Sequence, residues 1–196
     1  MWQHDTRLKL FYILYSCTLA ICAISCVLIN QKLKYQKYNL YHPIIYFVVG
    51  YTVFFWGGRG VDVGNDTHVY YWWFEKLHSV QVEPLFYYLM VFVSYFTKQP
   101  EYFLLVVSML TVFFLYRGSS NFANLYNVDL PIIFILLLMS SASLSMLGSG
   151  IRQGLAVSIC FYCLSKYLLD KKILKIFVIV LIAMLIHKSS VITILG

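Results

Sequence analysis

The chain has 196 residues, of which 61% are hydrophobic and only 12% are charged, and its formal net charge is +7. So few Asp, Glu, Lys and Arg side chains cannot coat a soluble globule of this length, so lipid must face most of the outside. The Lys residues fall in short segments between apolar runs, which argues against nucleic-acid binding. The composition indicates an all-α, polytopic membrane protein with one transmembrane domain, residues 1–196.

Seven apolar runs follow one another along the chain. They cover about residues 8–29, 41–56, 84–97, 101–116, 131–147, 151–169 and 173–195. Most are long enough to cross a hydrocarbon core of about 30 Å as modestly tilted helices. The 84–97 run, at roughly 21 Å of helix, is too short. The first run should remain as an anchor, because it is too long for the apolar core of a signal peptide.

The placement of basic residues decides how often the chain crosses. If 84–97 does not cross, the basic clusters between the other runs all lie inside, as the positive-inside rule prefers; these are Lys32/Lys34/Lys37, Arg117, Lys166 and Lys171/Lys172/Lys175. We therefore predict six spans and one interfacial or re-entrant segment, although Arg7 and Lys9 then lie outside. The polar interval of about 57–83 falls at the outer face, where residues 68–79 have the composition of a juxtamembrane helix.

Two ionisable residues of this outer interval are candidates for chemistry. Arg59 follows Gly57-Gly58, and Asp66 lies in the segment 64–70, Gly-Asn-Asp-Thr-His-Val-Tyr. A carboxylate there can accept a proton from an attacking hydroxyl. The alternative is a solvated loop in which Arg59 and Asp66 pair with each other or face water.

Arg152 opens the otherwise apolar run 151–169, directly after Gly148 and Gly150. A guanidinium at membrane depth is costly without a partner. Its planar fork suits the oxygens of a phosphate or diphosphate, and the first turn of a helix adds unpaired N–H donors. Alternatively, Arg152 reaches the interface or pairs with Asp129 or Asp62.

His187 lies in the last apolar run, where it either bonds a neighbouring helix or takes part in binding or proton transfer. The sequence shows neither metal-ligand spacing nor a Gly-rich nucleotide loop, so we expect no metal, no cofactor and no nucleotide-sugar donor. Cys160 and Cys163 have CxxC spacing, but inside an apolar run they are expected to act as small hydrophobes.

Four motifs in order give the chain a family resemblance. They are Arg59 with Gly64-Asn65-Asp66 and Tyr70, then Glu83-Pro84-Leu85-Phe86, then residues 150–156 (Gly-Ile-Arg-Gln-Gly-Leu-Ala), and finally His187-Lys188-Ser189. From about Tyr46 onward, the chain resembles the EpsG family of Wzy-like exopolysaccharide and O-antigen polymerases.

The resemblance implies a glycosyltransferase C-like helical bundle in the bacterial inner membrane. Such an enzyme would join repeat units carried on polyprenyl diphosphate at the periplasmic face, without a metal, for exopolysaccharide, O-antigen or capsule. Its partners would be the lipid-linked glycan, the lipid bilayer and a chain-length regulator.

Roles for individual residues also follow from the resemblance. Arg59 and Arg152 would contact the diphosphate or stabilise it as leaving group, and Asp66 would be the base for the acceptor hydroxyl. The expected substrate-binding residues are Gln153, His187, Asn65, Tyr70 and Asp62. The chain departs from the family pattern at Asn65, where a small residue is usual, and at 147–149, where an Asn often precedes Arg-Gln.

Three other functions compete with polymerisation. Family members usually continue for several more spans, so a truncated and inactive polymerase is one of them. A flippase for lipid-linked oligosaccharides would use the same Arg residues, although we find no internal repeat to support it. An acyltransferase with His187 as base would need an acyl carrier, which nothing in the sequence suggests.

Overall fold

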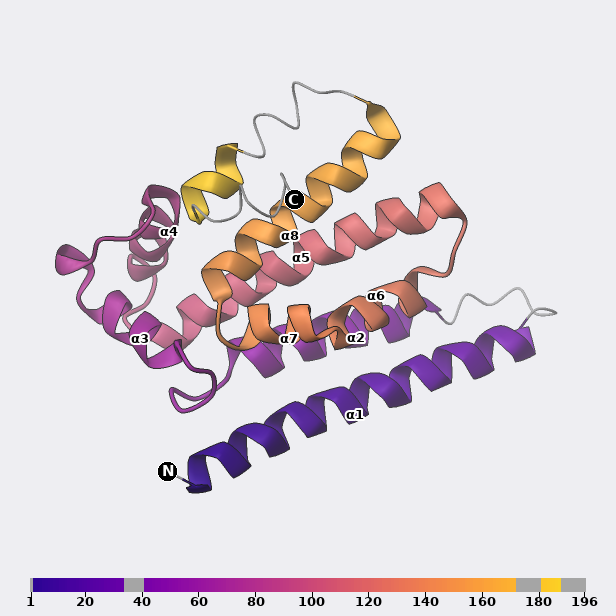
Figure 1. Ribbon diagram of the computed structural model, residues 1–196, viewed down its shortest axis with the longest axis horizontal. Helices are drawn as coiled ribbons and strands as arrows, with labels where there is room; N and C mark the ends of the chain where they lie inside the picture. The colour runs from indigo at the N-terminus through magenta and orange to yellow at the C-terminus, as the bar shows by residue number, and fades with distance from the viewer. Residues whose placement is uncertain (1, 34–40, 172–180, 188–196) are drawn as a thin grey trace.

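The computed structural model describes residues 2–33, 41–171 and 181–187, and every regular element within these ranges is a helix (Figure 1). In chain order the elements are α1 (Trp2–Leu33), α2 (Tyr41–Gly57), α3 (Thr67–Glu75), the 3-10 turn η1 (Leu77–Ser79), α4 (Pro84–Ser94), α5 (Pro100–Tyr126), α6 (Leu130–Met139), α7 (Ser141–Gly148) and α8 (Ile151–Asp170). Residues 181–186 are helical as well. The predicted all-α class is confirmed. Most of the last predicted run, 173–195, and several of the Lys residues used for sidedness lie outside the described residues.

Helix boundaries follow local chemistry. Pro occupies the first turn of α4, α5 and α6, where its missing N–H is not needed and its fixed φ suits the helix. The ends of α5 and α8 are closed by Asn127 and Lys171, whose φ angles of 54° and 51° place them in the left-handed region. The segment 68–79, predicted as a helix at the membrane surface, is helical in α3 and η1, and its position relative to the membrane stays a prediction.

Within the part of the chain that the structure describes, two helices are long and apolar enough to cross a membrane, Lys9–Ile29 within α1 and the whole of α5. A third span is available if α6 and α7 count as one, but they meet at an angle of 65°. At the break, the Ser140 hydroxyl donates to the Leu137 carbonyl and accepts from the Ser143 N–H. The apolar run 131–147 is therefore divided into two helices and is not one continuous helix. α2 and α4 are shorter apolar helices, so the count of six spans stays a prediction, as does the glycosyltransferase C-like arrangement.

The long helix α5 lies at the centre of the bundle, with its most extensive packing against α8 and then α2 (Figure 1). The approach of α5 and α8 is close: a Cβ at Gly118 would come within 2.5 Å of the Phe161 ring. Only a residue without a side chain leaves room for that ring. Phe161 therefore fits into a notch on α5 at Gly118.

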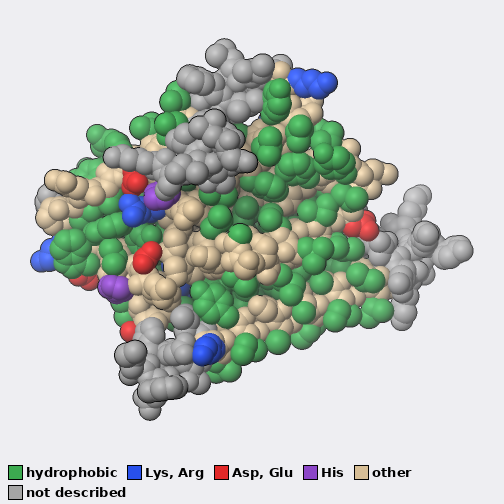
Figure 2. Space-filling model, viewed as in Figure 1, with side chains coloured by type: hydrophobic (Ala, Val, Ile, Leu, Met, Phe, Trp, Pro, Cys, Tyr) green, Lys and Arg blue, Asp and Glu red, His purple; other side chains and the backbone are tan. Residues whose placement is uncertain are grey.

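The polar parts of the chain gather at one end of this bundle. The 58–66 loop, α3, the start of α5 and the turn between α7 and α8 lie together there, away from the turns at Asn127 and Lys171 (Figure 1). In the space-filling view, His side chains and most of the Asp, Glu, Lys and Arg side chains appear at this same end, while hydrophobic side chains cover much of the remaining surface (Figure 2). The loop after α2 therefore lies beside the turn between α7 and α8.

Candidate functional site

Arg59 lies in the loop that follows α2, and its side chain is buried, with 2% exposure. Its Nη1 donates to the carbonyl oxygens of Trp56 and, at 2.9 Å, Leu147, while Nε donates to Thr67 Oγ1 at 3.1 Å. The guanidinium thus connects the ends of α2 and α7 with the start of α3. Burial lowers the pKa of Arg59 to about 10. Nη2 is buried without a hydrogen-bond partner.

The 58–66 loop lies directly against the turn between α7 and α8. Gly64 has a φ of 90°, and a Cβ there would overlap the carbonyl oxygen of Gly148. Glycine is required here both by the left-handed backbone and by the close approach. The Asn65 N–H donates to Ser149 Oγ at 3.2 Å. The Gly-Asn-Asp segment and the Gly148 region, far apart in sequence, therefore form one surface.

A second cluster surrounds Arg152 in the first turn of α8. Its Nη1 donates to Glu83 Oε2 at 2.7 Å, and its side chain is 23% exposed. The guanidinium carbon lies 4.6 Å from the centre of the Trp73 ring and 6.0 Å from that of Phe86. Arg152 pairs with Glu83, and not with Asp129 or Asp62, the partners considered from the sequence, because folding brings the start of α4 beside α8.

Glu83 also contacts His187. Its Oε1 lies 3.2 Å from His187 Nδ1, so one carboxylate joins a guanidinium and an imidazole. Sequence reasoning quoted Glu83 within a motif but gave it no role. The sequence does hold one signal for a role of Glu83, because it is an ionisable residue directly before Pro84, at the start of an apolar helix.

Helix α3 brings the two arginines together. Thr67, Tyr70 and Trp73 are three residues apart and share one face, and the first and last of them contact Arg59 and Arg152 respectively. The rise from Thr67 to Trp73 is about 9 Å. Tyr70, between them, is buried; its burial raises the pKa of its hydroxyl, and the nearby Arg152 opposes this.

The other predicted site residues are at the surface of the same end. Asp66 precedes the first residue of α3, where its side chain makes no cap hydrogen bond. Asp66, Asn65, Asp62 and Gln153 are all exposed. Arg59 bonds to Thr67 and backbone carbonyls, so the alternative in which it pairs with Asp66 is not what the structure shows.

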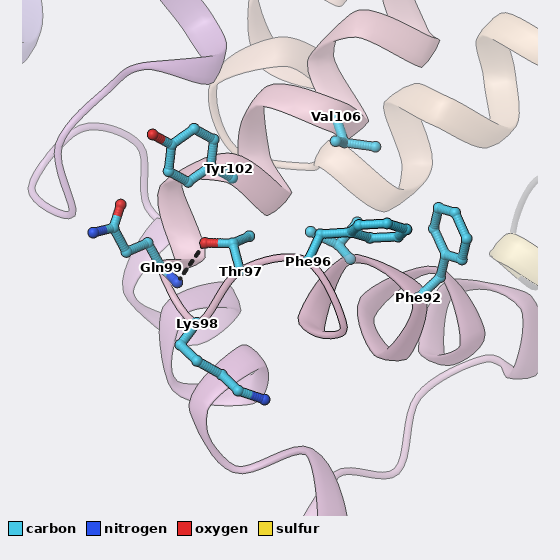
Figure 3. A pocket seen from close by; sticks show the side chains of 8 residues that line it. Phe92, Phe96, Thr97, Lys98, Gln99, Tyr102 and Val106 are labelled. Carbon is cyan, nitrogen blue, oxygen red and sulfur yellow. Dashed lines mark hydrogen bonds between the residues drawn. The ribbon is translucent and has the colours of Figure 1, made fainter.

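An open groove of about 680 Å³ lies between the end of α4 and the start of α5 (Figure 3). Phe92, Phe96, Tyr102 and Val106 form much of its lining, and Lys98 is its one charged residue. Lys98 Nζ donates to the Ser94 carbonyl at 3.2 Å. The groove is at the opposite end of α4 from Glu83 and lacks the convergent ionisable groups of the Arg152 cluster. We therefore place the candidate site at Arg152, Glu83 and His187.

Among residues 2–33, 41–171 and 181–187, no three His, Cys, Asp or Glu side chains come together in a way that could hold a metal ion. The Arg152 cluster instead combines a cation, a carboxylate, an imidazole and an aromatic ring. A partly exposed guanidinium of this kind is suited to binding an anion with several oxygens.

The fold and this site define a helical membrane protein with an anion-binding candidate site at one end of its bundle. Residues 39–196 match the EpsG family, and the chain belongs to that family. The predicted resemblance is confirmed, and membership points to a polysaccharide polymerase-like role. Comparison with curated proteins and with solved structures gave no match.

Proposed function

We propose that the protein polymerises polyprenyl-diphosphate-linked oligosaccharide repeat units into surface polysaccharide, at the periplasmic face of the bacterial inner membrane. Family membership supports the class of reaction. The gathering of ionisable side chains at one end of an apolar bundle supports a reaction at one membrane surface (Figure 2).

The observation that carries the proposal is the setting of Arg152. Glu83 occupies one edge of its guanidinium and Trp73 lies near its face. The Nε–H group is buried without a partner, and the side chain keeps 23% exposure. A delocalised cation held in this way can stabilise the negative charge that develops on a departing diphosphate.

The reaction is a displacement at the anomeric carbon of the donor sugar. The acceptor hydroxyl oxygen forms the new bond to that carbon while the bond to the diphosphate oxygen breaks, and the diphosphate leaves with the electron pair beside Arg152. A base takes the hydroxyl proton, and exposed Asp66 at the start of α3 is our candidate. Asn65, Asp62 and Gln153 are exposed at the same end and are the candidates for sugar contacts.

Arg59 takes a different part in this proposal from the one its motif predicted. Its hydrogen bonds to Leu147 and Thr67 support the loop that carries Asp66. Direct contact between Arg59 and the diphosphate stays a prediction. The variant Arg59→Lys distinguishes that contact from a supporting role.

Complementation of a strain lacking the gene tests the proposal. Arg152→Ala should abolish long glycan chains on gels and leave single repeat units on the lipid carrier at the outer leaflet. Arg117→Ala, at an exposed position on α5, is the matched control and should restore wild-type chain lengths. Long glycan from Arg152→Ala at a normal protein level would contradict the proposal. Single units retained at the inner leaflet would support the flippase instead.

A further inference from the structure

We infer that Glu83 is a positioning residue that holds Arg152 and His187 as one substrate-binding unit. The inference rests on the proposed function and assigns a role to a side chain outside the predicted site. Three segments meet at this carboxylate, since Glu83 is 69 residues from Arg152 and 104 residues from His187 along the chain.

Both oxygens of the carboxylate are engaged. Oε2 accepts from Arg152 Nη1 at 2.7 Å, a length typical of a charge-assisted bond, and Oε1 lies 3.2 Å from His187 Nδ1. The Glu83 side chain is only 10% exposed, and a carboxylate so far from water needs such partners. The two contacts fix its orientation, and through it the orientation of both partners.

The backbone shows that this side chain is directed to the cluster and away from its own helix. Glu83 occupies the N-cap position of α4, directly before Pro84, where a side-chain oxygen can accept a hydrogen bond from the first turn. No such cap bond is made. Its φ of −57° and ψ of 140° are extended values that the following proline favours. The position therefore supplies an acid on a rigid support.

The contact with Glu83 also selects a form of His187. A carboxylate accepts hydrogen bonds, so we infer that His187 Nδ1 carries the hydrogen that it shares with Glu83. Partners of this kind, which fix the tautomer and the ring plane, strongly influence the group they orient.

For Arg152, Glu83 and Trp73 restrict the guanidinium from two directions. Nη1 is fixed by the carboxylate and the ring of Trp73 lies 4.6 Å from the guanidinium carbon. The side chain keeps 23% exposure, and we infer that this open part of the guanidinium meets the diphosphate. The carboxylate also offsets the cation when no anion is bound, which makes a partly buried guanidinium tolerable.

The activity test uses the full gene in the complementation strain, with protein amounts matched by immunoblot. Glu83→Gln should reduce the rate of long-glycan formation by roughly tenfold to a hundredfold, because small displacements of binding groups have effects of this size. Glu83→Asp should recover part of the rate, and Glu75→Gln, at an exposed position on α3, should match wild type.

A spectroscopic test does not depend on polymer formation. The purified protein, labelled with ¹⁵N-histidine in detergent micelles, should show His187 protonated on Nδ1, with the signals assigned through their loss in His187→Gln. Glu83→Ala should shift protonation toward Nε2, and Glu75→Gln should not.

The two tests separate the inference from the function. Normal glycan from Glu83→Gln, or an unchanged His187 signal in Glu83→Ala, would overturn the inference and leave the polymerase proposal intact. A wild-type chain that forms no polymer but shows the expected His187 signals would overturn the proposed function, while Glu83 would still hold the imidazole.

Discussion

Arg59 and Arg152 lie along the same face of α3, yet the surroundings of their guanidinium groups differ. Arg59 is 2% exposed and donates to two backbone carbonyls and a threonine hydroxyl. Arg152 is 23% exposed, and its guanidinium contacts the carboxylate of Glu83 and the ring of Trp73. Backbone carbonyls near helix ends are fixed, whereas side-chain partners can rearrange around a ligand. In the proposed function, two arginines with the same predicted role therefore take different parts: Arg59 supports the loop and Arg152 binds the anion.

The largest expected effect on the Arg59 region comes from Gly64→Ala. The left-handed backbone and the overlap with the Gly148 carbonyl should force the 58–66 loop away from α7 and destabilise the protein by about 4 kcal/mol or more. Size-exclusion chromatography after heating in detergent measures the folded fraction. Gly60→Ala, which has nothing within 4 Å of the new Cβ, should behave as wild type. Equal stability of the two variants would refute the described contact.

Arg59→Lys should cost about 2–4 kcal/mol, because an ammonium cannot reach Leu147, Trp56 and Thr67 together and leaves buried acceptors unpaired. We expect lower thermal stability but wild-type glycan synthesis per folded molecule, with Arg117→Lys as control. The opposite result, normal stability with lost polymer, would show that Arg59 contacts the diphosphate as its motif predicted.

Trp73→Leu tests the Arg152 region through its aromatic neighbour. A partly desolvated cation–π contact contributes about 1–2 kcal/mol, so the rate of glycan formation should fall about tenfold with little change in stability. Trp72→Leu removes an exposed neighbouring ring and should have no effect on that rate. If both variants lose activity equally, the contribution of tryptophan comes from the membrane surface and not from Arg152.

Ser149→Ala should have the smallest effect. It removes the acceptor for the Asn65 N–H, but Asn65 is exposed and water can take over, so we expect a loss of about 0.5–1 kcal/mol in unfolding free energy. Exposed Ser141→Ala serves as control. A loss larger than that of Arg59→Lys would mean that Ser149, and not Arg59, is the main support of the loop.

Much of the helical architecture could be predicted because apolar runs are local signals. The start of α8 at Ile151 and the short α4 agree with the runs read from the sequence. The break between α6 and α7 at Ser140 was not predicted. A serine hydroxyl can bond to the backbone in a straight helix as well as in a bent one, and hydropathy does not distinguish the two kinds of helix. The extension of α5 beyond residue 116 was also missed. There Asn121 Nδ2 donates to Ser165 Oγ at 2.9 Å, a partner on another helix.

The candidate site was predicted in part for the same physical reason. Arg152 stood out because a guanidinium in an apolar run is costly, and this is visible in the sequence alone. Its partner was not visible, since Glu83, Asp62 and Asp129 are equivalent until the fold selects one. The burial of Arg59 likewise depends on the α7 end at Leu147, 88 residues away. The roles given to Asp66, Asn65, Asp62 and Gln153 stay predictions.

The fit of Phe161 against Gly118 has a consequence for the distant end of α8. A ring seated in a notch resists axial slippage, which opposes a shift of α8 along α5. Arg152 is nine residues before Phe161 on the same continuous helix, which transmits this fixed register over about 13 Å. The height of the guanidinium along α5 is thereby constrained by a contact in the second half of that helix.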